Sequence, residues 1–244
     1  MERVEKKPKG ERPPYREHQG PHRQYIRDII LGVNDGLVSI FLLVAGVVGG
    51  GLSNEAVLIA AVAAAIAGAV SMASGEYIAT KSQEEVFEGE MALEREHFKY
   101  HRERELDELR EWFGEMGLSH DDVERVVRAL DADDDALLRV MMALEFGVVE
   151  TERRKPYAAM LMSGLLFLAG SLPSILPFVF VGGTGLGLAL AAAFTGVALV
   201  AVGMLKTLAT RGNPWRGGLE NLAIAAAGGT VAYFVGTLFD GSAS

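Results

Sequence analysis

Two carboxylates and a thioether lie in stretches of the chain that are otherwise apolar. Asp35 belongs to an Asn-Asp-Gly-Leu-Val-Ser run at 34–39, and Met72 and Glu76 belong to a Ser-Met-Ala-Ser-Gly-Glu-Tyr run at 71–77. A carboxylate inside a membrane span costs about 2.5–3.5 kcal/mol, so it normally faces a partner, a cavity or an ion path. Neither stretch contains Lys or Arg, so a bound cation or a proton would have to balance the two carboxylates. Met72 adds a soft sulfur ligand, which favours a transition-metal ion over a proton alone.

Asp35 and Met72 are expected at the same membrane depth if the two stretches form an antiparallel helical hairpin. The turn that links the stretches is short, around 52–55, and the two residues are equally far from it along the chain. Glu76 follows Met72 by one helical turn, so it is expected on the same face and closer to the cytoplasm. A structural interpretation stays open, in which Asp35 and Glu76 form a partly protonated pair and Met72 only fills the core.

A second set of potential metal ligands lies in the charged segment 81–156. They are carboxylates, an imidazole and thioethers at helical spacings of three or four residues, so that each pair shares a helix face. The set consists of Glu94, His97, Glu105, Glu108, Met141, Met142 and Glu145. Such a mixture without thiolates suits a borderline ion such as Fe²⁺. The alternative is that the glutamates form a solvated helix face and the methionines fill a core.

Charged and apolar residues are segregated along the chain, which leaves five long apolar stretches. These stretches contain or flank the potential ligands and must therefore position them. Of the 23 Lys and Arg and 32 Asp and Glu residues, 34 lie in 81–156 and 13 in 1–28. Each apolar stretch is long enough to cross about 30 Å of hydrocarbon as a helix, and none alternates with the period of a β-barrel strand. We therefore expect an all-α polytopic membrane protein. The expected transmembrane helices are 29–52, 55–80, 157–181, 184–208 and 217–239.

The segment 81–156 is predicted to be a helical module between the second and third spans. It has 22 acidic and 12 basic side chains, but apolar residues recur through it at helical spacing. A first helix continues out of the second span until Gly114 and Gly117 break it, Ser119 caps a second helix, and the acidic run 131–135 starts a third. The predicted organisation is a tail (1–28), two spans (29–80), a three-helix metal-binding module (81–156) and three spans (157–244).

The distribution of Lys and Arg predicts the orientation in the membrane. The tail, the module and the turn between the fourth and fifth spans carry the basic residues, whereas the other two turns carry none. The positive-inside rule places the basic segments in the cytoplasm, and the polar, Pro-containing tail is predicted to be disordered there. The membrane is expected to be the cell membrane in a prokaryote and a vacuolar-type membrane in a eukaryote.

Small residues one turn apart mark the first span as a site of close helix packing. The pairs are Gly32 with Gly36 and Gly46 with Gly50. Such small-xxx-small pairs let helix backbones approach closely in lipid. A contact with a second copy of the chain is one candidate use.

Composition excludes several classes of protein. A net charge of −9 argues against a nucleic-acid partner, and the absence of Cys excludes disulfides, Cys-ligated zinc, iron–sulfur clusters and thiol catalysis. Neither an enzyme nor a prosthetic group is expected.

The alternative function is a membrane-anchored di-iron oxidase or iron-storage protein, because Glu94-x-x-His97 has the spacing of ferritin-like di-iron bundles. No second Glu-x-x-His motif occurs, which argues against it. A metal sensor or scaffold without transport would leave Asp35 and Glu76 unexplained.

The ordered combination of these motifs resembles the vacuolar iron transporter family. It consists of the runs at 34–39 and 71–77 and the acidic helical insert before the third span, and the similarity covers roughly 25–240. The resemblance implies a homodimeric, five-helix, proton-coupled antiporter that exports Fe²⁺ from the cytoplasm, with the ion path between the two protomers. Mn²⁺, Co²⁺ and Zn²⁺ are further expected metals, and membrane lipid is the expected surrounding.

The resemblance also implies roles for individual residues. Asp35 and Met72 match the translocation ligands, Glu76 belongs to the same motif, and protons are expected to act on the two carboxylates. The residues of the module that match the family's metal ligands are Glu94, Glu105, Glu108, Met141 and Glu145. His97 and Met142 stand where the family more often has glutamates. Both can bind a transition metal, but the loss of two carboxylates leaves metal number and selectivity open.

Overall fold

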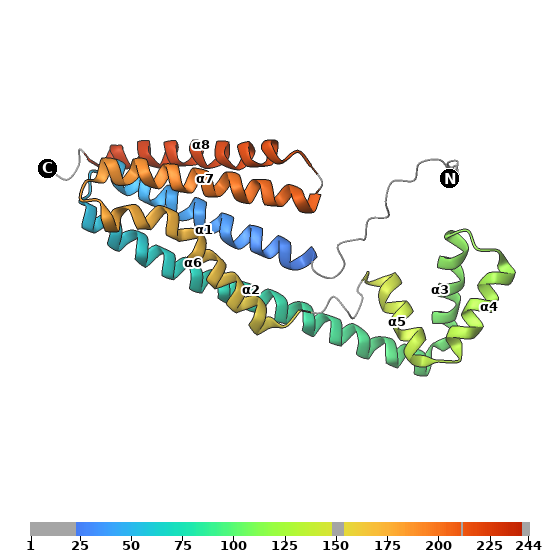
Figure 1. Cartoon of the computed structure of the whole chain (residues 1–244). Helices are drawn as coiled ribbons and strands as arrows, with labels where there is room; N and C mark the ends of the chain where they lie inside the picture. The colour runs from blue at the N-terminus through green and yellow to red at the C-terminus, as the bar shows by residue number, and fades with distance from the viewer. Residues whose placement is uncertain (1–22, 148–153, 211, 241–244) are drawn as a thin grey trace, which may run out of the picture.

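The computed structural model describes residues 23–147, 154–210 and 212–240, and the regular structure within these ranges is entirely helical (Figure 1). The helices form a membrane-type bundle and a smaller group of short helices at the far end of α2 (Figure 1). In chain order they are α1 (Arg23–Gly49), α2 (Asn54–Tyr100), α3 (Arg102–Glu115), α4 (His120–Asp131), α5 (Asp134–Glu145), α6 (Pro156–Phe180), α7 (Thr184–Thr210) and α8 (Pro214–Asp240).

Five of the helices are long and apolar enough to cross a membrane, which confirms the five predicted spans. They are α1, the first part of α2, α6, α7 and α8. The predicted boundary of the tail is wrong by several residues, because α1 already begins at Arg23. The apolar part of α1 still begins at Ile29, as expected. The predicted disorder of 1–22 lies outside the described residues.

The turn between α1 and α2 is as tight as the sequence predicts. Gly51 adopts a positive φ of 73° in this turn, a conformation that favours glycine. The Ser53 side chain then accepts a hydrogen bond from the backbone N–H of Ala56 and caps α2. The two helices therefore run antiparallel from a short connection, which is the hairpin that the placement of Asp35 and Met72 requires.

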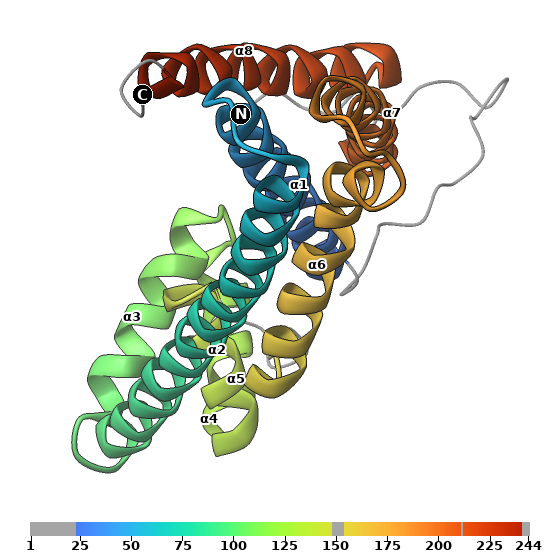
Figure 2. The same ribbon diagram turned by 90° about the vertical axis from the view of Figure 1, so that its left-hand side faces the viewer.

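The glycines of α1 make close contacts within the same chain. A Cβ atom at Gly36 would collide with the carbonyl oxygen of Phe167 in α6, and one at Gly236 of α8 would collide with the carbonyl oxygen of Gly46. Gly32 likewise faces Leu166 of α6. The use of these glycines for contact with a second copy is therefore wrong, because α6 and α8 already occupy their faces. Figure 2 shows α1 between these two neighbours.

The helical module consists of the end of α2 together with α3, α4 and α5. Helix α2 continues beyond its apolar part as one helix, as expected, but it ends at Tyr100 and not at Gly114. His101, with φ −135° and ψ 25°, breaks the helix, and α3 turns back from it. The predicted single first helix is therefore wrong: it is two helices, because Phe98 and Leu109 must enter the same core from either side of the break. Helix α3 ends at Glu115, and Gly117, two residues later, adopts a positive φ of 92°.

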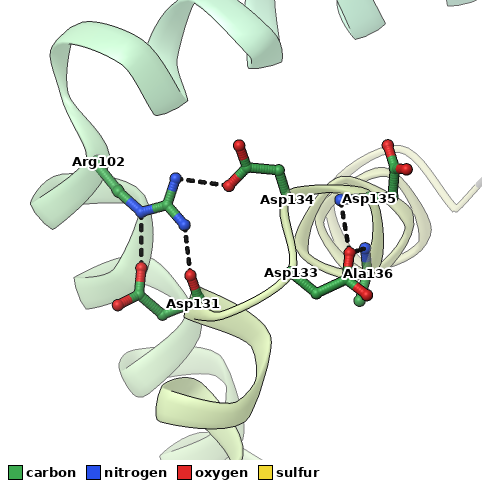
Figure 3. A network of polar contacts seen from close by, with 6 residues as sticks. All are labelled: Arg102, Asp131, Asp133, Asp134, Asp135 and Ala136. Carbon is green, nitrogen blue, oxygen red and sulfur yellow. Dashed lines mark hydrogen bonds and ion pairs between the residues drawn. The ribbon is translucent and has the colours of Figure 1, made fainter.

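Helix caps and one arginine fix the rest of the module. Ser119 caps α4 by accepting from the N–H of Asp122, and Asp133 caps α5 by accepting from the N–H groups of Asp135 and Ala136, as the sequence predicts. Arg102 donates from Nε to Asp131 Oδ1 (2.6 Å) and from Nη1 to Asp134 Oδ1 (2.7 Å) (Figure 3). Its Nη2 also donates to the carbonyl oxygen of Asp131 (2.6 Å) (Figure 3). One side chain thus joins the start of α3 to the end of α4 and the start of α5.

Candidate metal sites

Asp35 and Met72 line the same cavity between α1, α2 and α6. The cavity measures about 350 Å³, and Ser39, Ser71 and Phe167 also line it. Ser39 lies one turn after Asp35 and donates a hydrogen bond from Oγ to Asp35 Oδ1 (3.0 Å). Among the described residues no Lys or Arg pairs with Asp35. A carboxylate, a thioether and hydroxyls therefore converge on one space at the depth of the span, and this donor set suits a divalent transition metal.

Asp35 is exposed in the single chain, although it lies well inside the apolar part of α1. Met72 is half-buried and packs against the core of the bundle, so the core-filling interpretation of this side chain stays compatible with its position. The neighbouring Asn34 instead faces α8, where Asn221 donates to its Oδ1 (3.2 Å). The two adjacent residues of the first motif thus have different surroundings. The Asn34 amide joins α1 to α8, and the Asp35 carboxylate faces the cavity.

Glu76 does not line this cavity and has a partner of its own. Arg154, which lies just before α6, donates from Nη1 to Glu76 Oε1 at 2.9 Å. The expectation that only a bound cation or a proton could balance both carboxylates is therefore wrong for Glu76. The reason is that the balancing arginine comes from outside the two spans and is separated from Glu76 by the whole module. The role of Glu76 as a metal ligand and proton carrier stays a prediction.

A second group of ligand atoms gathers in the module, at the break between α2 and α3. Carboxylate oxygens of Glu94 and Glu105 and a ring nitrogen of His97 all lie within 4.8 Å of one another. His97 Nδ1 is 3.4 Å from Glu94 Oε2 and 3.1 Å from Glu105 Oε1. The turn at His101 creates this site, because it folds Glu105 of α3 back onto α2. Of the predicted ligands these three are therefore brought together.

The two carboxylates of this cluster are strongly buried. Glu94 is 3% and Glu105 4% exposed, and neither oxygen of Glu94 accepts a hydrogen bond within the described residues. Burial, together with the negative charges of Glu105 and Glu145, raises the pKa of Glu94 to about 8. Burial and the charge of Glu108 also raise the pKa of Glu105. Two buried carboxylates beside one imidazole fit a bound cation, which would supply the positive charge that balances them.

The other predicted ligands of the module lie around this cluster in different surroundings. Glu108 is half-buried and pairs with Arg104 (3.4 Å), and Glu145 is exposed at the end of α5. Met141 and Met142 are 0% and 3% exposed and belong to the hydrophobic core of the module. Their core position agrees with the structural alternative for methionine. Metal binding by these four residues stays a prediction.

Two residues next to the predicted sites were not singled out by sequence reasoning. Arg154 is one of several basic residues before Pro156, so only its contact with Glu76 distinguishes it. Asn221 carried a weak signal, since it is an amide within an apolar span and partners the amide of Asn34. Polar residues inside spans commonly mark such inter-helix contacts.

Comparison with known proteins gives one consistent result. The chain matches the VIT family over residues 26–237. It is 31% identical over 220 residues to vacuolar iron transporter 1 of Tulipa gesneriana, and the alignment covers 89% of each chain. It is 30% identical over 221 residues to vacuolar iron transporter 1 of Oryza sativa subsp. japonica, with 88% of each chain covered. It is also 30% identical over 210 residues to vacuolar iron transporter 1 of Arabidopsis thaliana, with 86% of this chain and 84% of the relative covered.

Proposed function

The chain belongs to the VIT family, and on this premise we propose that it is an iron transporter: a proton-coupled antiporter that exports Fe²⁺ from the cytoplasm. The relatives are named as transporters, and the chemistry of the site requires no bond-making step. Mn²⁺ is the second proposed cargo, because the carboxylate oxygens of the site also suit it. Co²⁺ and Zn²⁺ are weaker candidates.

The observation that carries the proposal is the cavity shared by Asp35 and Met72. An unpaired carboxylate at this depth is costly, and a migrating divalent ion would remove that cost during transport. The thioether adds affinity for a transition metal without a second full charge. A site of this kind holds an ion firmly enough to select it and weakly enough to release it.

Protonation of Asp35 is the proposed means of release. A metal ion binds the deprotonated carboxylate, so a proton and the ion compete for the same oxygens. A lower pH on the outer side would therefore load Asp35 with a proton and free the metal there. The Ser39 hydroxyl, which donates to Asp35, can hold the carboxylate in place in either state.

A homodimer is part of the proposal, with the ion path between the two protomers. Asp35 is exposed in the single chain, and so is Ser71, on the face of α2 that lines the same cavity. A second copy seated on this face would shield the carboxylate from lipid and close the cavity. The glycines of α1 are not part of this interface, because they contact α6 and α8.

The helical module is proposed to lie in the cytoplasm and to collect metal ions for the path. Its Glu94–His97–Glu105 cluster sits at the end of the helix that also carries Met72. His97 is the most exposed of the three, with 37% of its side chain accessible, so an ion can approach from that side. The positive-inside pattern of the sequence supports the cytoplasmic placement.

Transport into sealed proteoliposomes with an imposed pH gradient tests the proposal. Wild-type protein should accumulate Fe²⁺ with counterflow of protons, and Asp35→Asn, which keeps the shape but removes the charge, should reduce the rate to background. Glu55→Gln is the matched control, because Glu55 is an exposed carboxylate at the outer turn. If Asp35→Asn and Glu55→Gln transport equally well, the proposed path is wrong.

A calorimetric titration tests the module separately. Glu105→Ala combined with Glu108→Ala should lower the number of Mn²⁺ ions bound per chain and leave the protein folded. The control pair, Glu103→Ala with Glu111→Ala, removes two exposed carboxylates of the same helix. Equal stoichiometry in the two double variants would show that α3 presents only a solvated acidic face.

A further inference from the structure

Arg154 and Glu76 form an ion pair to which the proposed transport cycle assigns no role. The guanidinium Nη1 and Glu76 Oε1 are 2.9 Å apart, and the two side chains are 18% and 26% exposed. The pair is therefore screened by solvent much less than the pair of Lys81 with Glu85 on α2, whose side chains are 51% and 64% exposed.

A second contact beside the ion pair fastens the same two segments. The rings of Tyr77 and Tyr157 lie 5.2 Å apart between their centroids, one residue after Glu76 on α2 and three residues after Arg154 on the other segment. Helices α2 and α6 lie side by side at this level (Figures 1 and 2). The aromatic contact thus holds the start of α6 where Arg154 can reach Glu76.

Because Glu76 lies close to the cavity, its ion pair with Arg154 affects whether a metal ion can bind to Glu76. Glu76 follows Met72 by four residues on one helix, so its carboxylate stands one turn from the cavity that Asp35 and Met72 line. While the Arg154 guanidinium is bound there, it neutralises this carboxylate and also repels a divalent cation that approaches it. A metal ion and Arg154 therefore compete for the same oxygens.

We propose that Arg154 is an internal competitor for the metal: it occupies Glu76 while no ion is present and must be displaced before Glu76 can bind one. This inference rests on the proposed function, since it assigns a step of metal entry to a residue outside the cavity. Arg154 is a positioning residue, because its proposed effect on the metal is exerted through the Glu76 carboxylate. The displaced arginine returns to Glu76 when the ion moves on to Asp35, which favours forward movement of the ion.

The first test compares transport kinetics of matched variants in proteoliposomes. Arg154→Gln should lower the KM for Fe²⁺ roughly 1.5-fold to fivefold, the range expected when a partly screened ion pair no longer competes, and should lower kcat, because the ion leaves Glu76 more slowly. Arg154→Lys, which keeps the charge, should stay near the wild-type values. Lys155→Gln removes the adjacent exposed charge and should change neither constant.

The second test measures metal binding without transport. In protein that carries Glu105→Ala and Glu108→Ala, the dissociation constant of Mn²⁺ should fall by the same factor in Arg154→Gln and stay unchanged in Lys155→Gln. In Glu76→Gln, adding Arg154→Gln should have no further effect, because the carboxylate for which both cations compete is gone. If Arg154→Gln does not fold, Tyr157→Ala should lower the dissociation constant in the same direction, since it loosens the segment and keeps the arginine.

Equal Mn²⁺ affinity in the Arg154→Gln and Lys155→Gln variants would overturn the inference, even if transport by wild-type protein depends on Asp35 as proposed. An effect of Arg154→Gln that persists in the Glu76→Gln background would overturn it as well, because Arg154 would then act elsewhere. A failure of the proposed function is distinguishable from both results: wild-type protein would move no Fe²⁺, while the binding comparison could still be made.

Discussion

Replacing Glu94 by glutamine should stabilise the metal-free module above about pH 6 and abolish its metal affinity. The wild-type carboxylate is buried without a hydrogen-bond donor, and burial raises its pKa to about 8. Glutamine has nearly the same shape and no charge, so it avoids the cost of burying an ionised group. The same substitution removes the negative charge that would attract a cation.

The size and the pH range of the effect follow from the pKa shift. The folded-state pKa of Glu94, about 8, lies above the ordinary value of 4.5, so the folded module holds a proton that the unfolded chain has lost. The stabilisation is complete below about pH 4.5 and is lost as the pH rises towards 8. At 1.36 kcal/mol per pKa unit the upper limit is about 5 kcal/mol, and relaxation and solvent screening reduce this to about 2–4 kcal/mol.

Thermal unfolding of the full chain in detergent, followed by the fluorescence of Trp112, measures the effect. Trp112 packs against the core of the module, and Trp215→Phe removes the other tryptophan of the chain. In a chelator, the Tm of the module should fall by about 8 °C or more between pH 5 and pH 8. Glu94→Gln should flatten this dependence, whereas Glu96→Gln, an exposed carboxylate of the same helix, should follow the wild type.

Two results would refute this reasoning. One is a pH dependence in Glu94→Gln as steep as in the wild type, which would mean that the Glu94 carboxylate is solvated in the folded protein. The other concerns metal: saturating Mn²⁺ should restore the wild-type Tm at pH 8, because ion binding stabilises the folded state, and should leave Glu94→Gln unchanged. An equal rise in both proteins would place the bound ion away from Glu94.

Three further predictions concern packing. Gly36→Ala should lower the yield and stability of folded protein by about 1–3 kcal/mol, because its Cβ would collide with the α6 backbone; Gly75→Ala, where a Cβ meets nothing within 4 Å, should be neutral in the same thermal assay. Arg102→Ala should lower the Tm of the Trp112 transition by separating α3 from α4 and α5, and should leave the transmembrane bundle unchanged by circular dichroism. Met141→Leu should keep stability within about 1.5 kcal/mol of the wild type, since the two side chains have similar volumes; a large loss of Co²⁺ affinity in this variant would identify its sulfur as a ligand.

The number and position of the membrane spans could be predicted from the sequence alone. Hydrocarbon admits only long apolar segments whose backbone groups are all satisfied, so this information is local to each segment. The same holds for the caps at Ser119 and Asp133, because a cap depends on one side chain and the N–H groups two or three residues ahead. The shared depth of Asp35 and Met72 also followed from the sequence, since a short turn fixes the register of a hairpin.

Three features were decided only by tertiary structure. The break at His101 carries no Gly or Pro, and it arises because the apolar residues on both sides of it enter one core. That break brings Glu105 to Glu94 and His97, so the cluster cannot be deduced from helical spacing within either helix. The contact of Arg154 with Glu76 joins residues separated by 78 positions. Spacing along a helix predicts which residues share a face, whereas the partner that meets this face depends on how distant segments pack.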